Sequence, residues 1–350
     1  MDSYKVIGLM SGSSLDGLDI CYVEFKEVDQ QWTFDIKAVK CYSYTEDFQQ
    51  QLRNLGTGTA FQLAEMHTKF SRIMAEYVSK FMIEYPISNN ASLIVSHGQT
   101  IFHQPEKYFT TQIGCGATLS ALTNKTVVCD LRTYDVALGG QGAPLVPFGE
   151  KYLFLEYNTF LNIGGICNIS IHHQDKVEAY DVCPGNTLLN LLAMQDGYNY
   201  DENGNIARSG QINTELLFQL SEIEYYKKAL PKSLGTEHIM NEWWQIINNK
   251  NLYTADAMTT VVEHIAIELG KALKNSSVMV TGGGALNSYL MERIAVHANS
   301  EIIIPSREMI EFKEALIIAF VGLNRYLGRN NFYSSVTGAH RDNMGGAIYG

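Results

Sequence analysis

Three glycine-rich turns, each following a short apolar run, constrain this chain more than any other feature of its sequence. They are Ser11-Gly12, Gly164-Gly165 and Gly282-Gly283-Gly284. Glycine lets the backbone approach a ligand closely and presents N–H groups to an anion. Any single turn of this kind is explained as well by a tight reversal of the chain. Three of them at the ends of apolar strands together predict a nucleotide-binding cleft.

Two common nucleotide-binding motifs are absent from the sequence. None of the turns fits Gly-x-x-x-x-Gly-Lys-Ser/Thr, and the Gly-x-Gly-x-x-Gly pattern is missing, which excludes a P-loop protein and disfavours NAD. The net charge of −11 argues against nucleic acids and anionic membranes, which attract a basic face. Phosphates remain compatible with this charge, because backbone N–H groups and a divalent cation can hold them.

Length and composition indicate a globular protein of two ordinary domains. The chain has 350 residues, of which 46% are hydrophobic and 18% charged. No apolar run is long enough to span a bilayer, and the first residues lack the features of a signal peptide. The six cysteines are scattered, and several lie in apolar, strand-like stretches. We therefore expect reduced core cysteines in a cytoplasmic protein.

The order of predicted elements repeats itself once along the chain. A strand, a glycine turn, two further strands and a helix open the sequence, and the same order recurs after residue 158. No sequence repeat accompanies this echo, so we expect two domains of similar topology. Long helices are predicted over 255–273 and Glu314–Leu327. The predicted strands include Tyr4–Met10, Leu18–Phe25, Trp32–Val39, Thr159–Ile163, Cys167–His172 and Val177–Val182.

Eight segments, spread in order over essentially the whole chain, form distinctive motifs. They are Gly8–Asp19, Ser96–Thr100, Thr111–Gly114, Ala137–Pro147, Leu161–Ile166, Pro184–Asn186, Thr281–Gly284 and Glu314–Leu316. Together they resemble the motifs of the anhydro-N-acetylmuramic acid kinases, a bacterial family of the actin, hexokinase and Hsp70 superfamily. The first and fourth motifs are long and unusual, so chance explains the match poorly.

This resemblance implies a fold and a domain arrangement. The expected fold is a two-lobed α/β, actin-like ATPase (ribonuclease H-like) fold, with mixed sheets flanked by helices and a cleft between the lobes. The first lobe is expected to comprise 1–128 with a C-terminal segment of about 335–350. The second lobe is expected to comprise 129–334 and to carry the second phosphate turn, the catalytic aspartate and the adenosine-side glycine turn.

The resemblance also implies an activity. Members of the family open the 1,6-anhydro ring of 1,6-anhydro-N-acetylmuramic acid with water and phosphorylate O6, giving N-acetylmuramic acid 6-phosphate for peptidoglycan recycling. The implied co-substrate is ATP with Mg²⁺, and the implied partner is a small sugar. A homodimer is common in the family and is expected here. The chemistry needs a carboxylate that activates water, and in-line positioning for phosphoryl transfer.

Individual residues take their expected roles from their matches to the family motifs. Asp181 matches the catalytic base, and Asp16 is the expected contact of the metal that accompanies ATP. Arg132 suits the carboxylate of a muramic acid, because guanidinium binds carboxylates at two points. The expected substrate-binding residues are His97, Arg132, Gln141 and Glu314. The expected ATP-binding residues are Ser11, Gly12, Ser13, Ser14, Leu15, Asp16, Gly17, Asp19, Asn162, Gly164, Gly165, Gly282, Gly283 and Gly284.

Several of these residues have plainer structural explanations. Asp181 could cap the following helix, and Glu314 could be an ordinary first-turn helix glutamate. Asp16 could be a turn residue, and Arg132 could pair with Asp130. A metal site at His97 and His103 is rejected, because no third soft ligand follows at a suitable spacing.

The chain departs from the family pattern at a few positions. Ser13 replaces the usual threonine, Val182-Cys183 replaces Thr-Gly after the catalytic aspartate, and Cys115 and Asn190 replace aspartates. These changes leave two alternatives open. One is a kinase of the same fold for another sugar or anhydro sugar, and the other is a nucleotide-binding regulator without catalysis.

Overall fold

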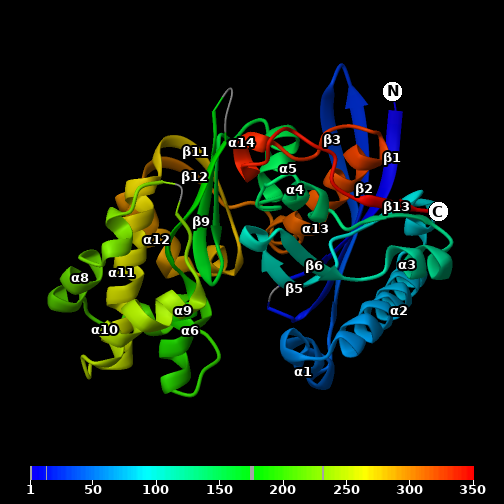
Figure 1. Cartoon of the computed structure of the whole chain (residues 1–350). Helices are drawn as coiled ribbons and strands as arrows, with labels where there is room; N and C mark the ends of the chain where they lie inside the picture. Colours follow the sequence, from blue (N-terminus) through cyan, green and yellow to red (C-terminus); the bar gives the residue numbers. More distant parts are fainter. Residues whose placement is uncertain (1, 13, 174–176, 231) are drawn as a thin grey trace. The chain divides into compact units, whose positions relative to one another are not determined.

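The chain folds into two compact units in a computed structural model, which describes residues 2–12, 14–173, 177–230 and 232–350. One unit comprises Met1–Leu155 and Phe312–Gly350, and the other comprises Glu156–Glu311 (Figure 1). The sequence places the boundaries at 128/129 and 334/335, whereas the compact units divide after Leu155 and after Glu311. The reason is packing: a β-carbon on Gly8 would lie 2.1 Å from the carbonyl oxygen of Ala315, so the helix after Phe312 lies directly on the first strand.

A six-stranded mixed sheet forms the first unit. Three antiparallel strands, β3, β2 and β1, are followed across the sheet by β4 and β7, which run parallel to β1, and β13 closes the edge antiparallel to β7. Two further strands, β5 and β6, form a separate hairpin. The strands are β1 (Asp2–Ser11), β2 (Gly17–Val28), β3 (Gln31–Ser43), β4 (Leu93–Ser96), β5 (Gln99–Gln104), β6 (Phe109–Ile113), β7 (Thr126–Cys129) and β13 (Ala347–Tyr349).

The second unit has a five-stranded sheet with the same core arrangement. Antiparallel strands β10, β9 and β8 are followed by β11 and β12, which run parallel to β8. The predicted echo of topology is therefore confirmed: each unit contains a three-stranded meander extended by two parallel strands. The strands are β8 (Thr159–Ile163), β9 (Ile166–His172), β10 (Val177–Pro184), β11 (Lys274–Thr281) and β12 (Asn299–Ile303).

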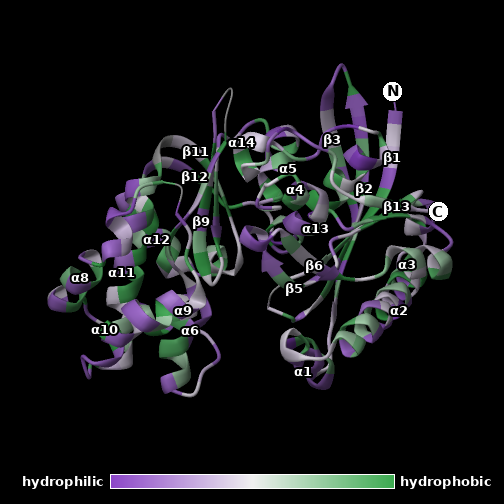
Figure 2. Cartoon of the chain, viewed as in Figure 1, coloured by the Kyte–Doolittle hydropathy of each residue, from purple (hydrophilic) through white to green (hydrophobic). Residues whose placement is uncertain are grey.

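Helices flank both sheets, and the longest of them have amphipathic patterns. In α2, Phe70, Met74 and Phe81 are buried, and Figure 2 shows polar and apolar residues interspersed along the helix. The predicted helix over 255–273 is confirmed as α11. The helices are α1 (Glu46–Asn54), α2 (Ala60–Glu84), α3 (Gly116–Thr123), α4 (Thr133–Ala137), α5 (Val146–Leu153), α6 (Asn186–Gln195), α7 (Asn205–Ser209), α8 (Thr214–Ser221), α9 (Thr236–Ile239), α10 (Gln245–Asn248), α11 (Thr254–Ala272), α12 (Ser288–His297), α13 (Arg307–Tyr326) and α14 (Ser334–Thr337).

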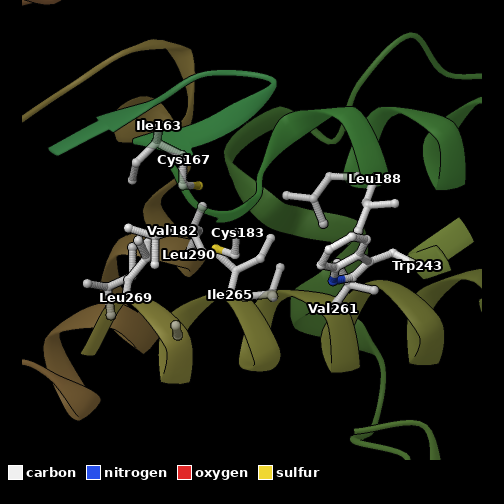
Figure 3. Packing of buried hydrophobic residues seen from close by; sticks show 14 of the residues in the cluster. Ile163, Cys167, Val182, Cys183, Leu188, Trp243, Val261, Ile265, Leu269 and Leu290 are labelled. Carbon is white, nitrogen blue, oxygen red and sulfur yellow. The ribbon is translucent and has the colours of Figure 1, made fainter. Parts of the chain in front are cut away.

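Each unit has its own hydrophobic core. In the second unit, α11 packs on the sheet, and Figure 3 shows Ile265 and Leu269 of this helix among the apolar side chains of β9, β10 and α12. Trp243 is fully buried in the same cluster, and its ring N–H donates to the hydroxyl of Tyr226 at 2.9 Å. The core of the first unit joins β1 and β2 to α2 and α3.

The cysteines were expected in the core, and no segment was expected to span a membrane. The six cysteines are reduced and four of them are buried, but the interpretation as core residues is wrong for two: Cys41 is exposed and Cys115 is half-buried. In the part of the chain that the structure describes, no helix combines the length and apolar character needed to cross a membrane.

Candidate active site

The turn between β1 and β2 carries most of the residues predicted to bind phosphate. The Leu15 N–H donates to the Gly12 carbonyl at 3.3 Å, and Leu15 adopts a left-handed conformation with φ of 62°. Ser14 and Asp16 are exposed, and Asp19 is half-buried within β2. The predicted phosphate ligand Ser13 lies outside the described residues.

Two glycines of this turn have different reasons to be glycine. A β-carbon on Gly17 would lie 2.5 Å from the carbonyl oxygen of Tyr42, so the fold requires glycine there. A β-carbon on Gly12 would meet only the Ser14 hydroxyl, at 3.7 Å. The fold thus leaves open space above Gly12, which is the arrangement that a close-approaching ligand needs.

Ser11 anchors the turn from inside the unit. Its side chain is buried, donates to the side-chain Oε1 of Gln99 at 2.6 Å and lies 2.8 Å from the Tyr44 hydroxyl. Because the Ser11 proton goes to Gln99, Tyr44 is the donor in the second bond. Sequence reasoning missed Gln99 and Tyr44, although Gln99 lies in one of the quoted motifs. These bonds fix the end of β1 against the β5–β6 hairpin.

A cavity of about 570 Å³ lies next to this turn, within the first unit. It brings together six of the predicted site residues, which come from β1, the segments after β4 and β7, and α13. Those six are Ser11, Gly12, Leu15, His97, Arg132 and Glu314. The other lining residues, which were not among the predicted site residues, are Met10, Leu52, Arg53, Gly56, Gln99, Thr100, Ile101, His103 and Ala143.

Arg132 contributes a positive charge to the cavity wall, and two hydrogen bonds hold its guanidinium group. Its Nε donates to Nε2 of His97 at 3.0 Å, and its Nη1 donates to the Gly142 carbonyl at 2.6 Å. Burial lowers the pKa of Arg132 to about 10, and the nearby Glu314 carboxylate opposes that shift. The guanidinium therefore stays charged near neutral pH. The alternative pair with Asp130 does not form: Asp130 accepts a hydrogen bond from the Thr133 hydroxyl.

Glu314 is the acidic residue of the same cavity. The helix α13 begins at Arg307, earlier than predicted, so Glu314 lies well inside it and the first-turn explanation is wrong. The Glu314 side chain is exposed and lines the cavity. Desolvation by the surrounding protein atoms raises the pKa of Glu314, whereas the charges of Lys313 and Arg132 act to lower it. A carboxylate in this environment accepts hydrogen bonds from hydroxyl groups readily.

Gln141 is not among the residues that line the cavity. Its loop is folded on the buried carboxylate of Asp135, which accepts from the Gly142 N–H at 2.7 Å and the Thr337 hydroxyl at 2.8 Å. The Gln141 N–H donates to the Thr337 carbonyl at 2.7 Å, and its side chain is exposed. A β-carbon on Gly140 would lie 2.2 Å from the Asp135 carboxylate. Much of this glycine-rich motif therefore serves the fold.

The two glycine turns of the second unit meet at one edge of its sheet. Strands β8 and β11 are parallel, with Asn162 opposite Thr281, so the turns that follow them are adjacent. A β-carbon on Gly282 would lie 2.6 Å from Oδ1 of Asn162, and one on Gly284 would lie 2.1 Å from the Ile163 side chain. The exposed Gly283 has only the Asn186 amide nearby, at 3.8 Å. Gly283 therefore faces open space.

The start of α6 fixes the other turn. The Gly185 N–H donates to the Gly165 carbonyl, and the Asn186 N–H donates to the Gly164 carbonyl, both at 2.9 Å. The structure therefore brings together all six predicted ATP-binding residues of this unit. They are Asn162, Gly164, Gly165, Gly282, Gly283 and Gly284.

Asp181 lies on β10 of the same sheet and is held by a neighbouring segment. Its backbone carbonyl accepts from the Tyr225 hydroxyl at 2.6 Å, and its backbone N–H donates to the Lys232 carbonyl at 3.1 Å. The Leu234 N–H donates to Oδ2 of Asp181 at 2.8 Å. The helix-cap explanation is wrong, because the N-cap of α6 is Gly185.

The carboxyl of Asp181 has a shifted pKa. Burial raises the pKa above its ordinary value, and the hydrogen bond from Leu234 partly offsets the rise. A carboxylate with a raised pKa is a stronger base than an ordinary one. Such a group is suited to accept a proton from water.

We next consider whether side chains could form a metal site without a nucleotide. Within the described residues, no group of three His, Cys, Asp or Glu side chains is arranged to hold a metal ion. His97 contacts Arg132, and His103 lies 3.0 Å from the Thr110 hydroxyl. Mg²⁺ that arrives with nucleotide phosphates needs only one or two protein carboxylates. The exposed Asp16 fits that modest role.

Comparison with known proteins places this chain in a family. The family model described as anhydro-N-acetylmuramic acid kinase matches residues 4–350. The kinase of that name from Aliivibrio fischeri is 36% identical over 99% of both chains. Those of Vibrio vulnificus (strain YJ016) and Sulfurimonas denitrificans are 37% and 32% identical over 82% and 98% of both chains.

Solved structures resemble the chain more distantly. The activator of the 2-hydroxyisocaproyl-CoA dehydratase from Clostridium difficile, with bound ADPNP, has 15% identity and a TM-score of 0.46 over 93% of this chain and 96% of that one. The matches at 32–37% identity, which cover 82–99% of both chains, decide the assignment. The chain belongs to the anhydro-N-acetylmuramic acid kinase family.

Proposed function

We propose that this chain is an ATP-dependent kinase that opens the anhydro ring of 1,6-anhydro-N-acetylmuramic acid with water and phosphorylates O6. The products are N-acetylmuramic acid 6-phosphate and ADP. The observation that carries the proposal is the family match over residues 4–350. The use of ATP and a sugar follows from the kinase family. Mg²⁺, a homodimer, a cytoplasmic location and the roles of single residues remain predictions.

The cavity of the first unit suits a small, anionic sugar. Arg132 offers donors for the carboxylate of the lactyl group, and Glu314 offers an acceptor for sugar hydroxyls. The Gln99 and Thr100 side chains add polar groups to the wall. This mixture of apolar wall and few fixed polar groups is typical of small-molecule sites.

Asp181 is proposed as the general base. Its Oδ2 is engaged by the Leu234 N–H, which fixes the carboxylate plane, and Oδ1 has no hydrogen-bond partner among the described residues. Oδ1 would accept the proton of the water that attacks the anomeric carbon. No separate general acid is needed, because the departing O6 is captured by the γ-phosphoryl group.

The glycine turns are proposed to hold ATP. The open backbone at Gly12 and Gly283 leaves room for close approach of phosphate and adenosine groups. Asp16 is the candidate carboxylate for the Mg²⁺ that accompanies ATP, and this ion would supply charge neutralisation at the phosphates.

Gly12→Ala tests the phosphate turn without disturbing the fold. The new β-carbon has open space, so the melting temperature should stay near that of the wild type. The KM for ATP should rise at least about tenfold, because the methyl group blocks close approach of the phosphates. Steady-state kinetics and thermal unfolding measure the two effects. Gly17→Ala is the contrasting variant: its β-carbon would meet the Tyr42 carbonyl, so stability should fall.

The pH profile tests the assignment of the base. Asp181 retains its proton to higher pH than an ordinary aspartate, so activity should rise as pH increases through that raised pKa. The acid limb of kcat should therefore lie above the ordinary value of 3.8. Enzyme held at each pH and returned to neutral controls for denaturation. Full activity maintained down to pH about 4 would remove a raised carboxyl pKa from the rate-determining chemistry.

ADP release with a panel of sugars tests the function itself. We expect 1,6-anhydro-N-acetylmuramic acid to stimulate ADP release far more than open-chain amino sugars or water alone. A stronger response to another sugar would identify a kinase of different specificity. ATP binding without stimulation by any sugar would indicate a non-catalytic regulator.

A further inference from the structure

The guanidinium group of Arg132 uses some of its N–H donors within the protein and leaves others available. Its Nε and one Nη1 proton are engaged by His97 and by the Gly142 carbonyl, at 3.0 and 2.6 Å. The second Nη1 proton and both Nη2 protons have no hydrogen-bond partner among the described residues. Glu314 lines the same cavity but forms no ion pair with Arg132 among those residues. Three donors are thus available, enough for a two-point contact with a carboxylate.

The contact with Arg132 fixes the chemical state of His97. Arginine Nε can only donate, so Nε2 of His97 must be the acceptor. The proton of the neutral ring then lies on Nδ1, which donates to the Gly98 carbonyl at 2.9 Å. Burial and the charge of Arg132 lower the pKa of His97 to about 3. The ring is therefore a neutral, single tautomer with both nitrogens engaged.

The fold holds this ring rigidly. His97 follows β4 directly, is 4% exposed, and its backbone N–H donates to the Leu9 carbonyl at 3.0 Å. Gly98 adopts φ of 73°, and a β-carbon on it would lie 2.6 Å from the Ile113 carbonyl. The backbone at the end of β4 therefore fixes the position of His97 Nε2, the atom that accepts the hydrogen bond from Arg132.

We propose that His97 is a positioning residue that aims Arg132 at the carboxylate of the sugar, and thereby makes the enzyme select acidic over neutral anhydro sugars. The inference rests on the proposed function. A free arginine side chain has many rotamers, and the entropy lost when a ligand orders it weakens binding of that ligand. The His97 acceptor and the Gly142 carbonyl provide that order before the sugar binds.

Two substitutions of His97 separate this role from packing. The side-chain amide of His97→Gln reaches the position of Nε2, so its oxygen can accept from Arg132. The amide of His97→Asn reaches only the position of Nδ1, so it keeps the bond to Gly98 and loses the acceptor. The KM for 1,6-anhydro-N-acetylmuramic acid should rise about tenfold to hundredfold in His97→Asn and less than about threefold in His97→Gln. The KM for ATP and kcat should change little in both.

A neutral sugar supplies the specificity readout. For 1,6-anhydro-N-acetylglucosamine, which lacks the lactyl carboxylate, kcat/KM or the inhibition constant should be nearly the same in wild type and both variants. The preference for the acidic sugar should therefore fall in His97→Asn. Arg132→Lys should lose the same preference, and adding His97→Asn to it should cause little further loss.

The outcomes distinguish this inference from the proposed function. A wild-type enzyme that is inactive on the acidic anhydro sugar contradicts the function. Equal losses in the Gln and Asn variants, or equal losses on the acidic and neutral sugars, contradict the role of His97. If His97→Asn fails to fold, Arg132→Lys decides: a preference for the acidic sugar that survives this change overturns the inference.

Discussion

Asp181→Asn is expected to lower turnover by roughly 10²–10⁴-fold, because the variant cannot accept the proton of the attacking water. Asparagine is nearly isosteric, and its Oδ1 can still accept the hydrogen bond from Leu234 that now reaches Oδ2. The fold and the KM for ATP should therefore be close to those of the wild type. Steady-state turnover, ATP binding and thermal unfolding together measure the effect.

The control for Asp181→Asn is Asp196→Asn in the same unit. Asp196 is exposed and accepts from the Thr254 hydroxyl, a bond that asparagine keeps. This variant should retain full activity. An active Asp181→Asn enzyme would remove Asp181 from the mechanism, and Glu314, whose carboxylate lines the cavity, would be the next candidate base.

Lys313→Met is expected to destabilise the first unit by about 3–5 kcal/mol. Lys313 of α13 lies 2.6 Å from Glu150 of α5, and both side chains are at most 5% exposed. Removing the cation takes away the attraction that offsets the lost hydration of the buried Glu150 carboxylate. The loss should be visible as a fall in the free energy of unfolding measured with urea.

Two further variants test the explanation. Glu150→Leu combined with Lys313→Met removes both charges and should recover much of the lost stability. Arg307→Met breaks an exposed ion pair with Glu311 on the same helix and should cost less than about 1 kcal/mol. Similar losses for Lys313→Met and Arg307→Met would contradict the importance of burial. Because Lys313 precedes Glu314, the stability of α13 also bears on the cavity.

The repeated strand order could be predicted because its signals are local. Apolar runs and glycine turns mark β1, β2 and β8 within a few residues each, and the two sheets confirm the echo. The β5–β6 hairpin was missed because its strands are rich in Thr, Gln and His and lack an apolar alternation. The start of α13 was missed because charged residues interrupt the apolar ones over 308–313, and the continuous apolar run begins only at Ala315.

The residues of the cavity could be predicted only in part. His97, Arg132 and Glu314 carry chemical groups that motifs reveal, and they do line one cavity. Gln141 was expected at the substrate, but the cavity wall does not include it, because buried hydrogen bonds to Asp135 shape its loop. Which parts of a glycine-rich motif serve the fold depends on contacts with distant segments, which the sequence does not reveal.

The structure explains the departures from the family pattern at Val182 and Cys183 by core packing. Val182 and Cys183 replace polar or small family residues, which raised the alternative of a different sugar. Both side chains are buried in the core of the second unit, where Figure 3 shows them with Cys167. Their changes concern packing, and they give little reason to expect a different substrate.

One turnover experiment in ¹⁸O-labelled water tests the central claim most directly. Purified protein with ATP, Mg²⁺ and 1,6-anhydro-N-acetylmuramic acid should produce ADP and N-acetylmuramic acid 6-phosphate in equal amounts. Mass spectrometry of promptly quenched product should find one ¹⁸O atom at the anomeric hydroxyl and none in the phosphate. Absence of a phosphorylated sugar, or ¹⁸O in the phosphate instead of at the anomeric carbon, would contradict hydrolytic ring opening coupled to phosphorylation of O6.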